Sequence, residues 1–432
     1  MILPSRRLLV GLRTLVLLRL AVHALFNPVY EGPDEPFHLA RARQVVDRPV
    51  AEVMRGGSVD PGVVRSIRAW PCGPSLNAAF GCPPFGGEPA AFNILGPARA
   101  AGAGKPQENY QAHQPPLYYL AAGSLLKLFS LAKISAPEAQ LLLLRLASVF
   151  LVGIALLLPV KRLGRENLLF ETVLLLALLL PGAAESLVRV ANDVSVFAWS
   201  ALLVSLVFRR DSFKPGLIAC LSALGPLLKL TALPVVAVAA MAGWRTRGWR
   251  CGLVVAISGL TFLPVQWLRG WAWGGTLEAN VPLSASESFQ MILVGLAHSV
   301  YTFLKTSVWL GGWAVFRPPI WLLVATSLFA LLLAIRVFRF KPRIENWPVH
   351  AAGMAIAALG FIFFAVGKHQ LFAVWGAVGG WYAWGWAPWL ALFAANALEL
   401  RAGRDRELIL GALLGATILN LAWFETALRT YG

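Results

Sequence analysis

Charged residues are scarce in this chain of 432 residues. Asp, Glu, Lys and Arg together make up 14% of the sequence, whereas soluble domains contain about 25%. Hydrophobic residues make up 58%, and apolar runs long enough to span a bilayer recur along the whole chain. This composition excludes an ordinary soluble domain. It predicts a single all-α polytopic integral membrane protein over residues 1–432.

Acidic residues are the scarcer charge, with 21 Asp and Glu against 38 Lys and Arg. Such a basic balance would suggest a nucleic-acid partner in a soluble protein. Here the basic residues cluster in short segments between apolar runs, which is typical of cytoplasmic loops in membrane proteins. We therefore predict a lipid bilayer and no nucleic acid as a partner. The clusters are Arg6-Arg7, Lys161-Arg162-Arg165, Arg209-Arg210-Lys214, Arg245-Arg247-Arg250, Arg336-Arg339-Lys341-Arg343 and Arg401-Arg404-Arg406.

Cysteine is also rare, and the four cysteines have no zinc-site spacing. Cys72 and Cys82 lie in the polar stretch "WPCGPSLNAAFGCPP", where an extracytoplasmic location favours a disulfide between them. The chain also lacks a phosphate-binding loop, because "GAGKP" at 102–106 has Pro106 in place of the required Ser or Thr. A nucleotide-activated substrate is therefore not expected.

Loop charge predicts about eleven crossings. A first span at 8–26 leads into a large extracytoplasmic loop, 27–138, in which 117–132 lies on the membrane surface because it is short and followed by Lys133. We expect core helices over 139–268, a second extracytoplasmic region with a surface-lying helix over 269–317, and C-terminal helices over 318–432. The further spans are about 139–160, 167–183, 194–208, a hairpin of two short helices at 215–244, 251–268, 319–336, 349–367, 381–398 and 407–424.

The stretch "NPVYEGPDEPFHLARA" at 27–42 places carboxylates and an imidazole beside the first span. Asp34 and Glu35 precede Pro36, which suits the first turn of a helix, so they are interpreted either as helix-capping residues or as functional acids. A carboxylate beside an apolar boundary suits a general base. Clustered carboxylates with His38 also suit a divalent metal.

Three further groups lie on the predicted outer side. "ENYQAHQPPLYYL" offers Glu108 and His113 before a Pro pair, or merely an interfacial anchor. "RVANDV" offers Asp193, which is either a helix cap or a functional acid. Lys229 lies between apolar half-helices, where it either snorkels to the interface or binds a phosphate. Arg145 and Arg189 allow the same phosphate interpretation, and the tryptophans of "GGWYAWGWAPW" at 379–389 are interpreted as an interfacial belt.

The order of these motifs resembles the GT-C superfamily of membrane glycosyltransferases. The series is an acidic pair after the first span, "PPLYY", an Arg in "LLRLASVF", an outer-turn Asp and a Lys between short helices. The superfamily includes the dolichyl-phosphate-mannose protein mannosyltransferases, the lipid A aminoarabinose transferases and the oligosaccharyltransferase catalytic subunits. "GPDEPFHLARA", "HQPPLYYLAAGSLLKLF" and "ANDVSVFAWSALL" look closest to a bacterial group of predicted members. The resemblance covers roughly residues 1–245.

The resemblance implies a GT-C-type helical bundle in the bacterial inner membrane, with the active site facing the periplasm or exterior. It implies transfer of a sugar from a polyprenyl-phosphate donor to a glycan or lipid acceptor of the cell envelope. Asp34 would be the general base, with Glu35 beside it. Some members use a divalent metal, for which Glu35, His113 and Asp193 are the candidates here. An acceptor or metal shell would comprise His38, Glu108, His113 and Asp193, and Lys229, Arg145 and Arg189 would bind the lipid phosphate.

Two other functions fit the same composition. A transporter or flippase for lipid-linked glycans also needs many spans and intramembrane cations, but it would favour mid-helix charges and an internal repeat. A non-catalytic assembly subunit would retain the fold without the activity. The clustering of acids at one predicted surface favours the transferase.

Overall fold

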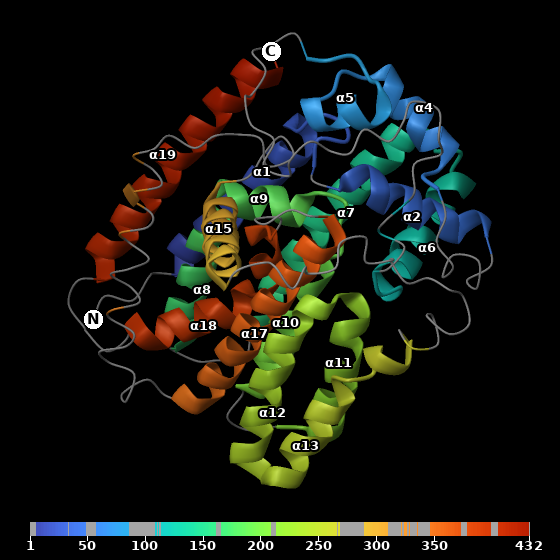
Figure 1. Cartoon of the computed structure of the whole chain (residues 1–432). Helices are drawn as coiled ribbons and strands as arrows, with labels where there is room; N and C mark the ends of the chain where they lie inside the picture. The colour runs from blue at the N-terminus through green and yellow to red at the C-terminus, as the bar shows by residue number, and fades with distance from the viewer. Residues whose placement is uncertain are drawn as a thin grey trace.

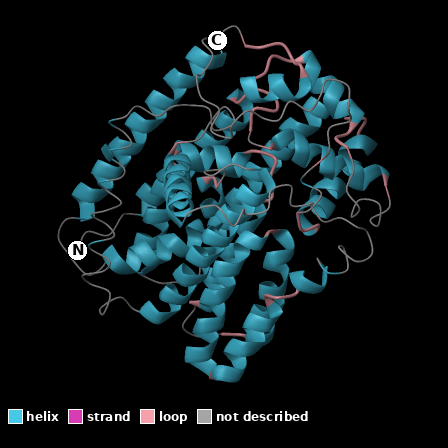
Figure 2. Ribbon diagram, in the orientation of Figure 1, coloured by secondary structure: helices cyan, strands magenta, loops and turns pink. Residues whose placement is uncertain are grey.

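The computed structural model describes most of the chain. The described residues are 6–32, 34–48, 58–85, 109, 111, 114–160, 166–208, 213–265, 267, 289–309, 321, 324–325, 328, 335, 346–372, 378–398 and 405–431. Helices dominate this part of the chain (Figure 2), and an isolated bridge joins Cys72 to Pro84. The all-α prediction therefore agrees with the described residues.

Figure 1 shows how the helices are arranged in space. In chain order they are α1 (Arg6–Phe26), α2 (Glu35–Asp47), α4 (Pro61–Ala69), α5 (Pro74–Phe80), α6 (Leu117–Leu131), α7 (Pro137–Val160), α8 (Glu166–Leu178), α9 (Pro181–Val188), α10 (Asp193–Val207), α11 (Pro215–Leu228), the 3-10 helix η2 (Leu230–Ala232), α12 (Leu233–Arg247), α13 (Trp249–Ser258), α15 (Phe289–Val308), α17 (Trp347–Phe372), the 3-10 helix η4 (Gly380–Trp386), α18 (Ala387–Leu398) and α19 (Asp405–Tyr431).

Four helices of the described part are long and apolar enough to cross a membrane. They are Arg7–Phe26, Pro137–Leu157, Trp347–Val366 and Leu410–Tyr431, and a fifth span results if the bent pair α8 and α9 counts as one. The chain is thus a helical membrane protein, whereas the eleven crossings stay a prediction. Residues 310–320 and most of the span predicted at 319–336 lie outside the described residues, as does 268–288 of the second outer region.

Two of the predicted spans have a different local structure. The span at 167–183 ends at Leu178, where the chain bends by 84° into α9, and all eight residues of α9 are buried. Residues 185–188, which lie between the predicted spans 167–183 and 194–208, therefore belong to a buried helix. The span at 381–398 is divided between η4 and α18, and the 12 residues of α18 extend only about 18 Å. Gly380 and its aromatic neighbours replace the first part of the expected helix.

The short-helix hairpin predicted at 215–244 is present as α11 and α12. Pro226 lies in the last turn of α11 and Pro234 in the first turn of α12. Proline removes a backbone donor and restricts its neighbours, so two prolines around Leu230–Ala232 separate the helices. Lys229 lies at this break, with extended backbone.

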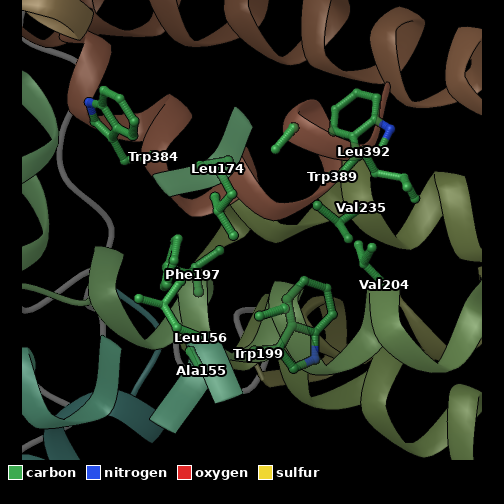
Figure 3. Packing of buried hydrophobic residues seen from close by; sticks show 14 of the residues in the cluster. Ala155, Leu156, Leu174, Phe197, Trp199, Val204, Val235, Trp384, Trp389 and Leu392 are labelled. Carbon is green, nitrogen blue, oxygen red and sulfur yellow. The ribbon is translucent and has the colours of Figure 1, made fainter. Parts of the chain in front are cut away.

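The largest apolar core joins α1 and α7–α12 to α18. Figure 3 shows part of it, with Phe197 and Trp199 of α10 opposite Trp384 and Trp389. A second core, around Tyr30, Leu39, Ile67 and Tyr119, packs α2 against α6, and α4 against α2, α5 and α7. Cys72 and Cys82 are joined by a disulfide within it, and they are the pair that the sequence predicted. The second core thus holds residues 58–85 of the first loop against the helices.

Candidate functional site

Glu35 is completely buried and forms an ion pair with Arg145 of α7. Arg145 donates from Nε to Glu35 Oε1 at 2.8 Å and from Nη2 to Oε2 at 2.5 Å. The backbone N–H groups of Val190 and Gly32 also donate to this carboxylate, at 3.0 and 3.3 Å. Both oxygens of Glu35 therefore have partners, and the residue connects α2, α7 and the turn between α9 and α10.

All three nitrogens of the Arg145 guanidinium group donate hydrogen bonds. Its Nη1 donates to the carbonyl oxygen of Asn27 at 2.6 Å, and its Nη2 to that of Pro28 at 2.9 Å. These contacts hold the C-terminal end of α1 against α7. Internal acceptors thus use the donors of Arg145, and its assignment to a lipid phosphate stays a prediction.

The turn between α9 and α10 presents a second buried ionic group. Asp193 accepts from Arg189 Nη2 at 2.7 Å through Oδ2 and from Lys229 Nζ at 2.6 Å through Oδ1. All three side chains are buried. A lysine has three donors and an arginine five, so neither cation exhausts its donors on Asp193. The structure thus brings together Asp193, Arg189 and Lys229, which lie up to 40 residues apart in the chain.

Aromatic rings cover both cations of this group. The Lys229 ammonium lies 4.6 Å from the ring centroid of Tyr382, and the Arg189 guanidinium lies 5.4 Å from that of Trp381. Cation–π contacts of this kind stabilise cations that are removed from water. Trp381 and Tyr382 belong to η4 and are buried, as are Trp384 and Trp389. The interfacial-belt interpretation of these residues is therefore wrong.

Asp34 lies beside this group and differs from its neighbour Glu35. Its backbone is in the left-handed region, with φ of 63°, and its side chain makes no capping hydrogen bond to α2. Left-handed backbone is uncommon for a residue other than glycine and often marks a functional position. Asp34 is partly exposed, and it interacts electrostatically with Arg189, Lys229 and Tyr382. The capping interpretation thus does not apply to the Asp34 side chain.

His38 lies one helical turn after Asp34 and faces α6. Its Nδ1 is 2.7 Å from the hydroxyl oxygen of Tyr119, and the two rings stack with centroids 5.8 Å apart. Tyr118 approaches the same imidazole edge-on. The "PPLYY" helix start therefore places both tyrosines beside the histidine of the first loop.

The polar segment before the Pro pair reaches α2 and α10. Asn109 Nδ2 donates to the carbonyl oxygen of Phe37 at 3.0 Å. Asn192 Nδ2 donates to Gln114 Oε1 at 3.4 Å and to the carbonyl oxygen of Leu228 at 3.3 Å. Glu108 and His113 lie outside the described residues, so their proposed roles stay predictions.

A divalent metal does not fit the described residues. No group of three or more His, Cys, Asp or Glu side chains that could hold a metal occurs among them. The two described candidates have cationic partners, Arg145 on Glu35 and both Arg189 and Lys229 on Asp193. A cation entering between them would displace these ion pairs, so no catalytic step is assigned to a metal.

Sequence reasoning missed two parts of this arrangement. It did not select Trp381 and Tyr382 as partners of the cations, although the closely spaced glycines of "GGWYAWGW" indicate close backbone approach. It also did not select Glu185, which is buried in α9 and bound to His23. A glutamate within an apolar helix is the signal that would have identified it.

A family model described as "Predicted membrane protein (DUF2142)" matches residues 17–373. The match includes Asp34, Arg189, Asp193 and Lys229, and it ends before Trp381 and Tyr382. No curated protein and no solved structure matches the chain.

Proposed function

The chain belongs to the DUF2142 family of predicted membrane proteins, and we propose that it is a membrane glycosyltransferase. It moves a sugar from a polyprenyl-phosphate donor to a glycan or lipid acceptor of the cell envelope, with Asp34 as the general base. One observation carries the proposal. Asp34 is partly exposed beside two buried cations, Arg189 and Lys229, that are held by a second carboxylate, Asp193.

In the proposed reaction, Asp34 removes the proton from an acceptor hydroxyl. The resulting oxygen attacks the anomeric carbon of the donor sugar, and the bond between that carbon and the phosphate oxygen breaks. The lipid phosphate leaves with the bonding electrons, and its new negative charge is stabilised by the positive charges of Lys229 and Arg189. Fixed donors at the position where charge develops commonly contribute strongly to catalysis.

The distribution of buried groups supports separate roles for the two neighbouring acids. Glu35 fixes the turn that carries Arg189 and Asp193, because its Oε1 accepts from the Val190 N–H. The Asp34 side chain makes no capping hydrogen bond to α2, and it is partly exposed. We therefore assign positioning to Glu35 and proton transfer to Asp34.

Location and orientation belong to the same proposal. We place the protein in a bacterial inner membrane with Asp34 on the extracytoplasmic side. Asp34 follows the C-terminal end of α1, whereas Arg7 lies at the other end of this candidate span. Basic residues favour the cytoplasmic side, which supports this orientation.

The test is a deletion strain complemented with wild type, Asp34→Asn or Glu35→Gln, with cell-envelope glycans and membrane protein levels measured in each. Asp34→Asn should lower glycan transfer by about 10²–10⁴-fold, the range for loss of a general base, at normal protein level. Glu35→Gln should lower the protein level itself, because it leaves the buried Arg145 partly unpaired at a cost of about 3–5 kcal/mol.

Glu425→Gln is the matched control, because Glu425 forms an exposed ion pair with Arg429. It should restore both glycans and protein level. Full complementation by Asp34→Asn would exclude Asp34 as the base. A deletion strain with unchanged glycans but altered transbilayer distribution of the lipid-linked sugar would favour a flippase.

A further inference from the structure

Polar side chains follow one another at a spacing of four residues at the C-terminal end of α1, namely Arg19 and His23 within the helix and Asn27 directly after it. His23 Nε2 lies 2.7 Å from Glu185 Oε2, and Asn27 Nδ2 donates to the same carboxylate at 3.3 Å. These contacts join α1 to the buried helix α9. The carboxylate of Glu185 is therefore used by His23 and Asn27, and it forms no ion pair with Arg19 within the described residues.

Arg19 is 8% exposed and faces α19 instead. Its Nε donates to Asn420 Oδ1 at 2.7 Å, and its guanidinium lies 5.4 Å and 5.1 Å from the ring centroids of Trp423 and Phe424. Both terminal nitrogens, Nη1 and Nη2, are buried without a hydrogen-bond partner. A buried charge without partners is costly, so these two nitrogens favour a ligand that accepts hydrogen bonds.

A second unpaired donor occurs in the same region. Trp309 Nε1, at the end of α15, is buried without a partner. The Trp309 ring packs in one apolar cluster with Leu419, Trp423 and Ala427 of α19. We call Arg19, Trp309, Asn420, Trp423 and Phe424 the α1–α19 seam. Its unsatisfied atoms are all donors, which indicates a ligand rich in acceptor oxygens.

Side chains beside the seam are accessible to lipid. On α1, Leu18 and Val22 are 60% and 40% exposed, and on α19, Ile418 and Leu421 are 44% and 65% exposed. Both helices are candidate membrane spans, and α19 lies along one side of the molecule (Figure 1). A hydrophobic tail can therefore lie against these residues while its headgroup approaches Arg19.

We propose that the α1–α19 seam binds the phosphate of an anionic membrane phospholipid. The two free guanidinium nitrogens form a planar fork that matches two phosphate oxygens. Arg19 lies seven residues before the end of α1, which is about 10 Å along the helix. Arginine at this depth draws headgroups and water inward. Glu185 attracts Arg19 electrostatically but leaves these donors unfilled. The seam shares no residue with the group around Asp34, so this proposal is independent of glycosyl transfer.

The experiment is native mass spectrometry of the full chain in detergent, titrated with phosphatidylglycerol or with inorganic phosphate. Wild type should retain phosphatidylglycerol, and Arg19→Gln should bind it roughly tenfold more weakly, because charged hydrogen bonds contribute about 1.5–3 kcal/mol. Arg429→Gln should bind like wild type. It removes an exposed cation of α19 without removing a buried donor.

Two milder variants address the chance that Arg19→Gln fails to fold. Arg19→Lys keeps the charge but loses the planar fork, and Trp309→Phe removes the Nε1 donor together with part of a buried ring. Each should weaken phosphatidylglycerol binding by a smaller factor than Arg19→Gln, with thermal stability unchanged in Arg19→Lys and lowered in Trp309→Phe. Equal binding by wild type and both variants would overturn the proposal. Displacement of the lipid by inorganic phosphate would identify free phosphate as the ligand and overturn the lipid assignment.

Discussion

Asp34 and Glu35 are adjacent in the chain but have different environments. The left-handed backbone of Asp34 leaves its carboxylate partly exposed, whereas the Glu35 carboxylate is enclosed by Arg145, Val190 and Gly32. A left-handed residue redirects the chain locally, which explains why two neighbouring acids point to different partners. At the residue scale, the proposed general base and the buried, ion-paired carboxylate are therefore separated by one peptide bond.

Glu31 is a second buried acid of the same loop. Its Oε1 accepts from the Gly73 N–H at 2.7 Å, at the start of α5 and beside the disulfide, and its Oε2 has no partner. Burial raises the pKa of Glu31 from 4.5 to about 8, and the nearby Glu185 and Glu35 add to this effect. The folded protein therefore holds a proton on Glu31 at pH values where the unfolded chain does not.

This pKa predicts that alkaline pH weakens the packing of α5. Between pH 4.5 and about 8 the folded state binds more protons than the unfolded state, so stability decreases as pH rises through this interval. Thermal unfolding in detergent should show a lower melting temperature at high pH than at mildly acidic pH. Glu31→Gln should reduce this dependence while keeping the bond from Gly73. An unchanged pH dependence in Glu31→Gln would exclude Glu31 as its source.

At the element scale, α9 is the feature that positions the site. It turns by 84° from α8 and lies buried between α1, α15 and η4, with its last residue leading into Arg189. Glycines allow this arrangement. A Cβ on Gly182 would lie 2.3 Å from the carbonyl oxygen of Ser307, and one on Gly380 would lie 2.1 Å from the Ser307 backbone nitrogen. Three chain segments therefore meet at Ser307.

Gly182→Ala and Gly380→Ala should each destabilise the protein. Neither added methyl group has space, and overpacking typically costs about 1–3 kcal/mol. The measurement is the melting temperature and the yield of folded protein in detergent. Gly360→Ala is the control, because nothing lies within 4 Å of its added Cβ, and Ala stabilises a helix interior relative to Gly. Equal melting temperatures for all three variants would contradict the close packing at Ser307.

For the whole molecule, one cluster of exposed arginines lies far from the first helices of the outer loop. The helices α2, α4 and α5 lie toward one end, and the turn between α12 and α13 lies at the opposite end (Figure 1). That turn presents Arg245, Arg247 and Arg250 as exposed residues. Basic residues in short loops of membrane proteins stay preferentially in the cytoplasm. We therefore expect this turn on the cytoplasmic side.

This arrangement predicts opposite accessibility for two engineered cysteines in a background lacking Cys220 and Cys251. Trp70→Cys, at the exposed end of α4, should react with a membrane-impermeant thiol reagent in intact cells. Arg247→Cys should react only after permeabilisation. The two labelling patterns, read by gel shift, determine the orientation. Labelling of Arg247→Cys in intact cells would show that the protein has the opposite orientation in the membrane.

The sequence by itself determined the helical membrane class, the pairing of Cys72 with Cys82 and the break at Lys229. Each depends on local signals, namely long apolar runs, a polar segment with two cysteines, and prolines at helix ends. The candidate residues Asp34, Asp193, Arg189 and Lys229 were also found in this way, because ionisable residues are rare in apolar sequence.

Only the tertiary structure decided which charges pair. Glu35 with Arg145 and Asp193 with Lys229 are separated by 110 and 36 residues, and no local pattern relates them. The same holds for α9, whose bend and burial depend on Ser307 and Gly380 from distant segments. A carboxylate becomes structural or reactive according to the donors that surround it, and those donors come from other helices. Packing therefore assigned Glu35 to structure and left Asp34 beside the cations.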